Sequence, residues 1–203
     1  MKNRFDHVLQ FKVTLKGVKP LVWRRVQVPC TYTFWDLHVA IQDAMGWSDC
    51  HLHAFTLRDS PKRILMEIGI PSEDDLPDAP IVYPGWMVLV ARHITLADRN
   101  AEYAYDFGDG WEHTVLLEMI IPRDPSLNYP VCVAGRRACP PEDCGGPWGY
   151  RDLLEALADP KHKEHDTLLT WVGGSFDPEE FDPAAVSFDD PQERWKLAFL
   201  ERE

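Results

Sequence analysis

The stretch Tyr103–Glu118, YAYDFGDGWEHTVLLE, indicates the fold class of this chain. On both sides of Gly108-Asp109-Gly110, large apolar side chains alternate with polar ones, which is the period-two pattern of half-buried strands. Asp-Gly is a strong hairpin signal, because glycine adopts positive φ without a side-chain clash. The stretch therefore predicts two antiparallel strands joined by a tip that is crowded with acidic and imidazole side chains.

A helix is predicted at residues 34–45, where apolar side chains recur one helical turn apart and form a single stripe. Thr33 is the expected N-cap, and Asp36 stands at N3, the arrangement of a capping box. Gly46 follows the last apolar position and is suited to end the helix, because it tolerates a left-handed conformation.

The same periodicity arguments predict further strands before and after this helix and helices in the last third of the chain. Since strand patterns dominate the first part and helical patterns the end, the predicted fold class is α+β. We expect one domain over residues 1–203, with a mainly antiparallel sheet, the helix of the N-terminal half packed on it and a helical C-terminal region. The additional predicted strands are 8–15, 21–28 and 51–58, and the additional helices are 150–158, 162–172 and 192–201.

Charge is unevenly distributed along a chain whose net charge is −12. Residues 1–58 carry eight Lys/Arg and four Asp/Glu, whereas residues 59–203 carry 13 and 29. Two interpretations stay open: the halves complement each other electrostatically, or the first half presents a basic surface centred on Lys12, Lys16, Lys19, Arg24 and Arg25. Because Arg24 and Arg25 are consecutive in a predicted strand, they point to opposite faces. Together with the net negative charge, this disfavours direct nucleic-acid binding.

Residues 1–10 carry charges and lack the apolar core of a signal peptide. No apolar run reaches the roughly 18 residues that a membrane span requires. We therefore expect a cytoplasmic protein without membrane association. In that reducing compartment the five cysteines are expected to remain thiols.

Short motifs follow one another in a fixed order along the chain. They are Val22-Trp23-Arg24-Arg25, Met45-Gly46-Trp47, His51-Leu52-His53-Ala54-Phe55, Tyr105-Asp106-Phe107-Gly108-Asp109-Gly110-Trp111-Glu112-His113 and Cys139-Pro140-Pro141-Glu142-Asp143-Cys144-Gly145-Gly146. Over residues 8–185 the chain resembles the plasmid pRiA4b ORF-3-like proteins, also described as insertion-element passenger proteins. The resemblance implies an α+β fold and an association with plasmids and mobile elements. It implies no established reaction.

Three segments carry the side chains of a candidate polar pocket: the strand at 51–58, the hairpin tip at 106–113 and the Pro/Gly-rich loop at 139–146. We expect these segments to converge in space and form the pocket. We expect the protein that carries it to be an accessory or binding protein associated with plasmids and mobile elements. The predicted pocket residues are Trp47, His51, His53, Asp106, Asp109, Trp111, His113, Glu142 and Asp143.

A divalent metal is the sharpest hypothesis for this pocket, because imidazole, carboxylate and thiolate are its usual ligands. The candidate ligands are His51, His53, Asp106, Asp109, Cys139 and Cys144. The competing interpretation is a hydrogen-bonded polar cluster that fixes the loops. An enzymatic alternative is a metal-dependent hydrolase, for instance a phosphodiesterase, with Asp109 or His113 as general base.

The eight tryptophans leave a further alternative open. They either fill the core or line a groove for a protein partner, since aromatic anchors are favoured at interfaces. The tryptophans considered for such a groove are Trp23, Trp35, Trp47, Trp86, Trp111 and Trp148.

Overall fold

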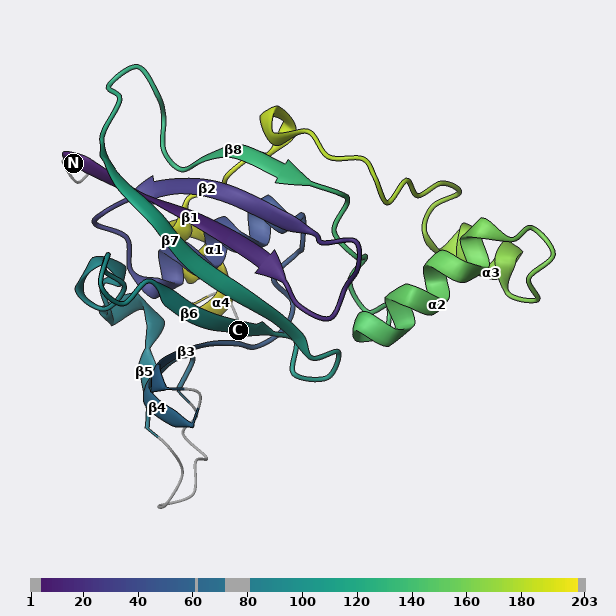
Figure 1. The fold of residues 1–203 in the computed structure, drawn as a ribbon, viewed down its shortest axis with the longest axis horizontal. Coiled ribbons are helices and arrows are strands. Elements are labelled where there is room, and N and C mark those ends of the chain that lie inside the picture. Colours follow the sequence, from purple (N-terminus) through teal and green to yellow (C-terminus); the bar gives the residue numbers. More distant parts are fainter. Residues whose placement is uncertain (1–4, 61, 72–80, 201–203) are drawn as a thin grey trace.

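The computed structural model describes residues 5–60, 62–71 and 81–200. In these ranges eight strands form one sheet in the order β5-β4-β3-β6-β7-β1-β2-β8 (Figure 1). All neighbouring pairs are antiparallel except β4–β5, which is parallel. The predicted α+β fold with a mainly antiparallel sheet is confirmed. The strands are β1 (His7–Leu15), β2 (Trp23–Pro29), β3 (His53–Ser60), β4 (Arg63–Gly69), β5 (Val82–Pro84), β6 (Asn100–Tyr105), β7 (Trp111–Pro122) and β8 (Val131–Arg136).

Helices cover one face of the sheet and extend beyond one end of it (Figure 1). The two on the covered face, α1 and α4, lie behind the strands in this view, whereas α2 and α3 lie past the β1–β2 turn. In the described ranges, no helix combines the length and apolar character needed to cross a bilayer. The helices are α1 (Phe34–Met45), α2 (Gly146–Ala158), α3 (His165–Trp171) and α4 (Pro191–Phe199), with 3-10 turns at Gly85–Met87, Val90–Arg92 and Pro183–Ala185.

Helix α1 has the boundaries that the sequence predicts. The Asp36 amide donates to Thr33 Oγ1 at 3.2 Å, and the Thr33 amide donates to Asp36 Oδ2 at 2.8 Å, which completes the capping box. Gly46 ends the helix with φ 86° and donates its N–H to the Gln42 carbonyl. The apolar stripe is buried against the sheet, and each large side chain in it contributes about 1.5–3 kcal/mol.

Strand β2 presents Arg24 and Arg25 to opposite faces of the sheet, as predicted. Arg25 lies on the outer face and binds Glu118, with Nε 2.6 Å from Oε2. Arg24 is only 1% exposed and donates from Nε to the Ala44 carbonyl at 2.8 Å. That carbonyl lies in the last turn of α1, where helix carbonyls lack partners within the helix. The interpretation of a basic surface that includes Arg24 is therefore wrong, because this side chain is buried.

The two edges of the sheet differ in how they are bounded. Strand β5 is three residues long and ends in Pro84. At the opposite edge, the chain after α3 returns along β8, where the Ala138 amide donates to the Pro178 carbonyl at 3.1 Å. The Phe181 ring occupies the space where a side chain at Gly135 would project. The same ring lies 3.7 Å from the guanidinium carbon of Arg24.

Several predicted boundaries differ from those observed. Strand β3 begins at His53, so His51 precedes it. Helix α2 begins at Gly146 rather than at residue 150, since Gly145 and Gly146 adopt positive φ and allow an early turn into the helix. Residues 71–80 contain four acidic residues and three prolines, a composition that predicts a loop. Apart from Pro71, this segment lies outside the described residues.

Candidate functional site

Three segments bring His51, Asp106 and Asp143 together. His51 precedes β3, Asp106 follows β6, and Asp143 belongs to the loop between β8 and α2. His51 Nε2 lies 3.1 Å from Asp143 Oδ1 and 3.6 Å from Asp106 Oδ2. One ligand atom from each residue lies within 4.8 Å of the others, close enough for the three residues to be candidates to share an ion. We call these three residues the surface triad.

The hairpin tip orients Asp106 by a local turn. Asp106 has φ 52°, a left-handed conformation that aspartate tolerates better than most residues. Its Oδ1 accepts hydrogen bonds from the amides of Gly108 at 3.0 Å and Asp109 at 3.2 Å. Its own amide donates to the Leu52 carbonyl at 3.0 Å. The second carboxylate oxygen is the one that faces His51.

Asp109 anchors the 139–146 loop to the hairpin tip. Its Oδ2 accepts a hydrogen bond from the Gly145 amide at 3.1 Å. Gly146 packs so closely that an added Cβ would overlap with the Asp109 carbonyl oxygen. Asp109 is therefore a neighbour of the surface triad in the hairpin tip, but its Oδ2 oxygen is used to hold the 139–146 loop.

Replacement of Gly146 by alanine is expected to separate the loop from the hairpin tip. Gly146 and Gly110 both have φ +68°, but a Cβ at Gly110 meets open space. Gly110→Ala is therefore expected to cost about 1–2 kcal/mol from backbone strain alone. Gly146→Ala should cost about 1–3 kcal/mol more, because the backbone must also shift. Urea unfolding of both variants measures the difference, and equal losses would contradict the contact.

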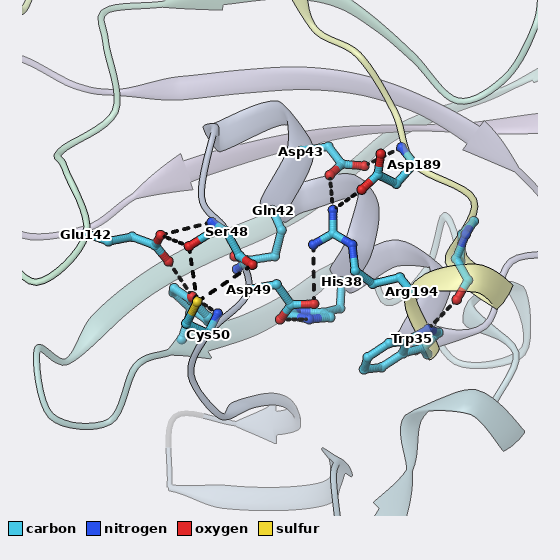
Figure 2. Close-up of polar contacts among 12 residues, drawn as sticks. Trp35, His38, Gln42, Asp43, Ser48, Asp49, Cys50, Glu142, Asp189 and Arg194 are labelled. Atoms are coloured by element: carbon cyan, nitrogen blue, oxygen red, sulfur yellow. Dashed lines mark hydrogen bonds and ion pairs between the residues drawn. The ribbon is translucent and has the colours of Figure 1, made fainter. Parts of the chain in front are cut away.

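Glu142 connects the same loop to the segment after α1 (Figure 2). It accepts hydrogen bonds from the amide and the hydroxyl of Ser48, the former at 2.9 Å. Its other oxygen accepts from the Tyr105 hydroxyl at 2.6 Å. Burial, reinforced by Glu142, raises the pKa of Tyr105. Glu142 is thus committed to structural hydrogen bonds.

The predicted pocket tryptophans form the apolar floor below these loops. Trp47 and Trp111 are 5% and 1% exposed, with ring centroids 5.8 Å apart. Trp47 also stacks on Tyr105 and donates from Nε1 to the Pro140 carbonyl at 3.0 Å. They belong to the core and hold the 139–146 loop in place.

Cys139 and Cys144, two of the predicted metal ligands, are not suited to bind a metal ion together with the surface triad. Both are free thiols that pack against the apolar core. Burial raises the pKa of both, that of Cys144 to about 12. A raised pKa disfavours the thiolate that a metal or a nucleophilic mechanism requires. In the described part of the chain, neither cysteine belongs to a group of side chains able to share an ion.

His113, a candidate general base, is fully buried. Its Nδ1 lies 3.2 Å from the Tyr103 carbonyl oxygen. Since a carbonyl only accepts, Nδ1 carries the proton. Burial lowers the pKa of His113 to about 3, so the ring stays neutral. A side chain in this position cannot touch a ligand at the surface.

His53 belongs to a second, buried group rather than to the surface triad. Its ring stacks on His38 with centroids 3.5 Å apart and planes inclined by 10°. His38, Asp49 and His53 also bring one ligand atom each within 4.8 Å. We call them the buried triad. Burial lowers the pKa of His38 to about 3 and raises that of Asp49 to about 6.

Hydrogen bonds use both ring nitrogens of His38. Nε2 lies 2.7 Å from Asp49 Oδ1 and donates to it when that carboxylate is ionised. Nδ1 is then an acceptor for the Tyr103 hydroxyl at 2.8 Å, and that hydroxyl accepts from Gln42 Nε2 at 2.8 Å. No lone pair of His38 is left for a metal, so His38 and Asp49 belong to a hydrogen-bonded network, which His53 contacts by ring stacking.

Arg194, from α4, supplies positive charge to this network (Figure 2). Its guanidinium lies 2.7 Å from Asp43, 2.6 Å from Asp189 and 3.5 Å from Asp49. Asp49 and Arg194 are not among the predicted site residues. Asp49 follows the predicted helix end in the segment that also contains Trp47 and His51, which was the available signal. Nothing local connects Arg194 to residues about 150 positions earlier.

These features define an α+β protein with an open, mainly antiparallel sheet and a histidine–carboxylate cluster at the tip of its central hairpin. The family described as plasmid pRiA4b ORF-3-like protein matches residues 7–185, and the chain belongs to that family. It is 42% identical over 181 residues to the uncharacterized protein y4hQ of Sinorhizobium fredii, covering 89% of this chain and 87% of that protein. It is also similar to the crystal structure of MM3350, a protein of unknown function from Methanosarcina mazei Go1. That similarity has a TM-score of 0.83 and 43% identity, and covers 91% of this chain and 100% of the other.

Proposed function

We propose that this protein binds a divalent metal ion at the surface triad of His51, Asp106 and Asp143. The observation that carries the proposal is the approach of three ligand atoms from three separate segments. An ion about 2.1 Å from each ligand, in tetrahedral or octahedral geometry, holds neighbouring ligand atoms about 3.0–3.5 Å apart. The His51 distances of 3.1 and 3.6 Å are close to that range.

The site would leave coordination positions open to solvent. The side chains of His51 and Asp143 are 32% and 72% exposed, whereas that of Asp106 is 10% exposed and fixed by its turn. Two carboxylates also give the site a negative charge that attracts cations. One imidazole with two carboxylates suits zinc or manganese, since imidazole favours the first and oxygen ligands the second.

The competing arrangement is an ion pair between a protonated His51 and its two carboxylates. The ion pair and the metal site involve the same atoms at the same distances. The distances therefore do not distinguish them, and a titration with metal does. Isothermal titration of metal-stripped protein with Zn²⁺ or Mn²⁺ is expected to show one ion per chain. His51→Ala and Asp143→Asn should each weaken binding at least about tenfold, because losing even an outer-shell partner costs about 10–100-fold.

The matched control is His162→Ala, which removes an imidazole between α2 and α3 and should bind as the unaltered protein does. Thermal unfolding of each variant establishes that it is folded. If folded protein takes up neither ion, or if His51→Ala binds as tightly as the control, the proposal is overturned and the ion pair is the better description.

Metal-assisted hydrolysis is a second candidate, favoured by the open side of the site. The Oδ1 oxygen of Asp109 makes no hydrogen bond to the described residues, so Asp109 would be available as a general base beside an ion held by His51, Asp106 and Asp143, which would supply Lewis-acid activation of water. The metal-loaded protein can be assayed with bis(p-nitrophenyl) phosphate, with Asp109→Asn as the variant. Loss of turnover with retained metal affinity supports this second candidate, and absence of turnover removes it.

We also propose more widely that the protein is an accessory or binding protein of plasmids and mobile elements that acts in the cytoplasm. The word plasmid in the family description supports the first part of this proposal. In that role the metal site would engage a partner through the open coordination positions. Affinity capture with metal-loaded protein, compared with His51→Ala, tests whether any partner depends on the site.

A further inference from the structure

A cavity of about 670 Å³ lies between the β1–β2 turn and the start of α2. Gly17 in the turn approaches Pro147 so closely that an added Cβ would be 3.1 Å from its Cγ, so the two walls pack directly against each other. Val18, Leu21 and Leu154 contribute apolar surface. A volume of this size is typical of small-molecule sites, which span about 300–1,000 Å³.

The charged residues of this cavity are all basic. Lys16, Lys19 and Arg151 line it and no acidic residue does, in a chain with 33 Asp/Glu and 21 Lys/Arg. Lys16 pairs with Glu102 at 3.2 Å, and Arg151 pairs with Asp152 at 3.0 Å, so both already have acidic partners outside the cavity. Within the described residues, Lys19 makes no ion pair. Its ammonium is therefore the lining charge that remains for an anionic ligand.

An aromatic surface adjoins these cations. Trp148 is 71% exposed, although large aromatic side chains are usually buried. The Arg151 guanidinium lies 4.7 Å from its ring centroid, which holds the indole in position by a cation–π interaction. A flat exposed indole in an apolar cavity favours a planar ring as ligand, because aromatic pairs add to the gain from burial.

We propose that this cavity binds a small planar aromatic carboxylate, with the ring against Trp148 and the apolar wall and the carboxylate at Lys19. The cation-only lining accounts for the anionic group, and the exposed indole accounts for the ring. The inference does not depend on the metal site, since none of the surface triad residues lines this cavity.

The test uses 2-naphthoate and its uncharged analogue 2-naphthamide in isothermal titrations with the full chain. The carboxylate is expected to bind more tightly than the amide. Lys19→Gln should reduce that preference about 2–5-fold, the usual range for an exposed ion pair. Trp148→Ala should weaken both ligands about 3–10-fold, through loss of the aromatic contact.

Lys163→Gln is the matched control, because it makes the same charge change at an exposed position outside the cavity and should keep the preference. Equal binding of carboxylate and amide to the unaltered protein would overturn the proposal, as would an unchanged preference in Lys19→Gln. The other possible occupant of the cavity is a second copy of the chain. Sedimentation of the unaltered protein and of Trp148→Ala, which measures the oligomeric state, tests for it. A dimer of the unaltered protein that this change dissociates would assign the cavity to a second copy of the chain and overturn the proposal.

Discussion

Arg24→Ala is expected to lower the free energy of unfolding by about 3–5 kcal/mol, whereas Arg25→Ala should lower it by less than about 1 kcal/mol. The two residues are consecutive in β2 and identical in chemistry. The difference arises from the face of the sheet on which each one lies. Urea unfolding of both variants under the same conditions measures it.

The large effect at Arg24 follows from the segments that its side chain connects. The guanidinium donates to the carbonyls of Ala44 at 2.8 Å, Trp23 at 2.9 Å and Arg136 at 3.1 Å. It therefore joins the end of α1 to β2 and the adjoining edge strand. Its positive charge lies at the C-terminal end of α1, where the helix dipole is negative and the last turn contains no basic residue. Removal leaves a cavity and a buried carbonyl without a partner, and each unsatisfied group costs about 1–3 kcal/mol.

Arg25 provides the internal control because its environment is solvated. Its side chain is 30% exposed and pairs with Glu118 on the outer face of the sheet. The pair is only partly exposed, since the Glu118 side chain is 18% exposed, so we expect the upper end of the about 0.2–1 kcal/mol that exposed ion pairs contribute. Similar losses for the two alanine variants would show that the buried guanidinium does not stabilise the junction of these segments.

Stability is also expected to fall steeply as the pH drops below about 6, because three buried imidazoles stay neutral in the folded protein. Burial lowers the pKa of His38 and of His113 to about 3 and that of His53 well below its usual value. In the unfolded chain these groups have a pKa near 6.5. Between about pH 6.5 and 3 the unfolded chain therefore binds more protons, and acid favours unfolding.

The size of the effect follows from proton linkage. Each histidine that stays neutral in the folded state contributes up to about 1.4 kcal/mol per pH unit within that window. Asp49 acts in the opposite sense between about pH 4 and 6, because its pKa of about 6 lets the folded state take up a proton first. The net slope is expected to be about 1–3 kcal/mol per pH unit, enough to unfold a domain of ordinary stability near pH 4–5.

His113→Gln isolates one of these groups, because glutamine keeps a hydrogen-bond donor but does not titrate. Its stability is expected to depend less steeply on pH by up to about 1.4 kcal/mol per unit between pH 6 and 4. His162→Gln, at a partly exposed position, should leave the slope unchanged. Urea midpoints measured across pH 4–8 give the slopes, and a flat profile in the unaltered protein would contradict the neutral buried histidines.

Local patterns predicted the elements well, since each depends on residues close together in the chain. The capping box at Thr33 and Asp36 and the glycine at residue 46 determined both ends of α1. Alternation placed Trp111 and His113 on the same strand face as Val115. That pattern therefore predicts that His113 is a core residue. His113 was instead interpreted as a site residue, because its imidazole is close to the hairpin turn in the sequence.

The site itself depended on contacts that no local pattern encodes. His51 and His53 are two residues apart, but the strand begins between them, so alternation does not determine their relative orientation. His53 is instead placed by stacking on His38, and Asp49 by its contacts with His38 and Arg194. Those partners come from two different helices, whose docking depends on the whole core.

The edges of the open sheet bear on strand pairing between molecules. An unpaired strand edge is a template for strands of other molecules, and proteins restrict such edges with short strands, proline or a covering segment. Here β5 offers only three residues and ends in Pro84. At β8, the Phe181 ring packs over the face of the sheet at Gly135, and the Pro178 carbonyl accepts a hydrogen bond from Ala138, just past the strand end. The return segment after α3 therefore limits intermolecular strand pairing at this end of β8.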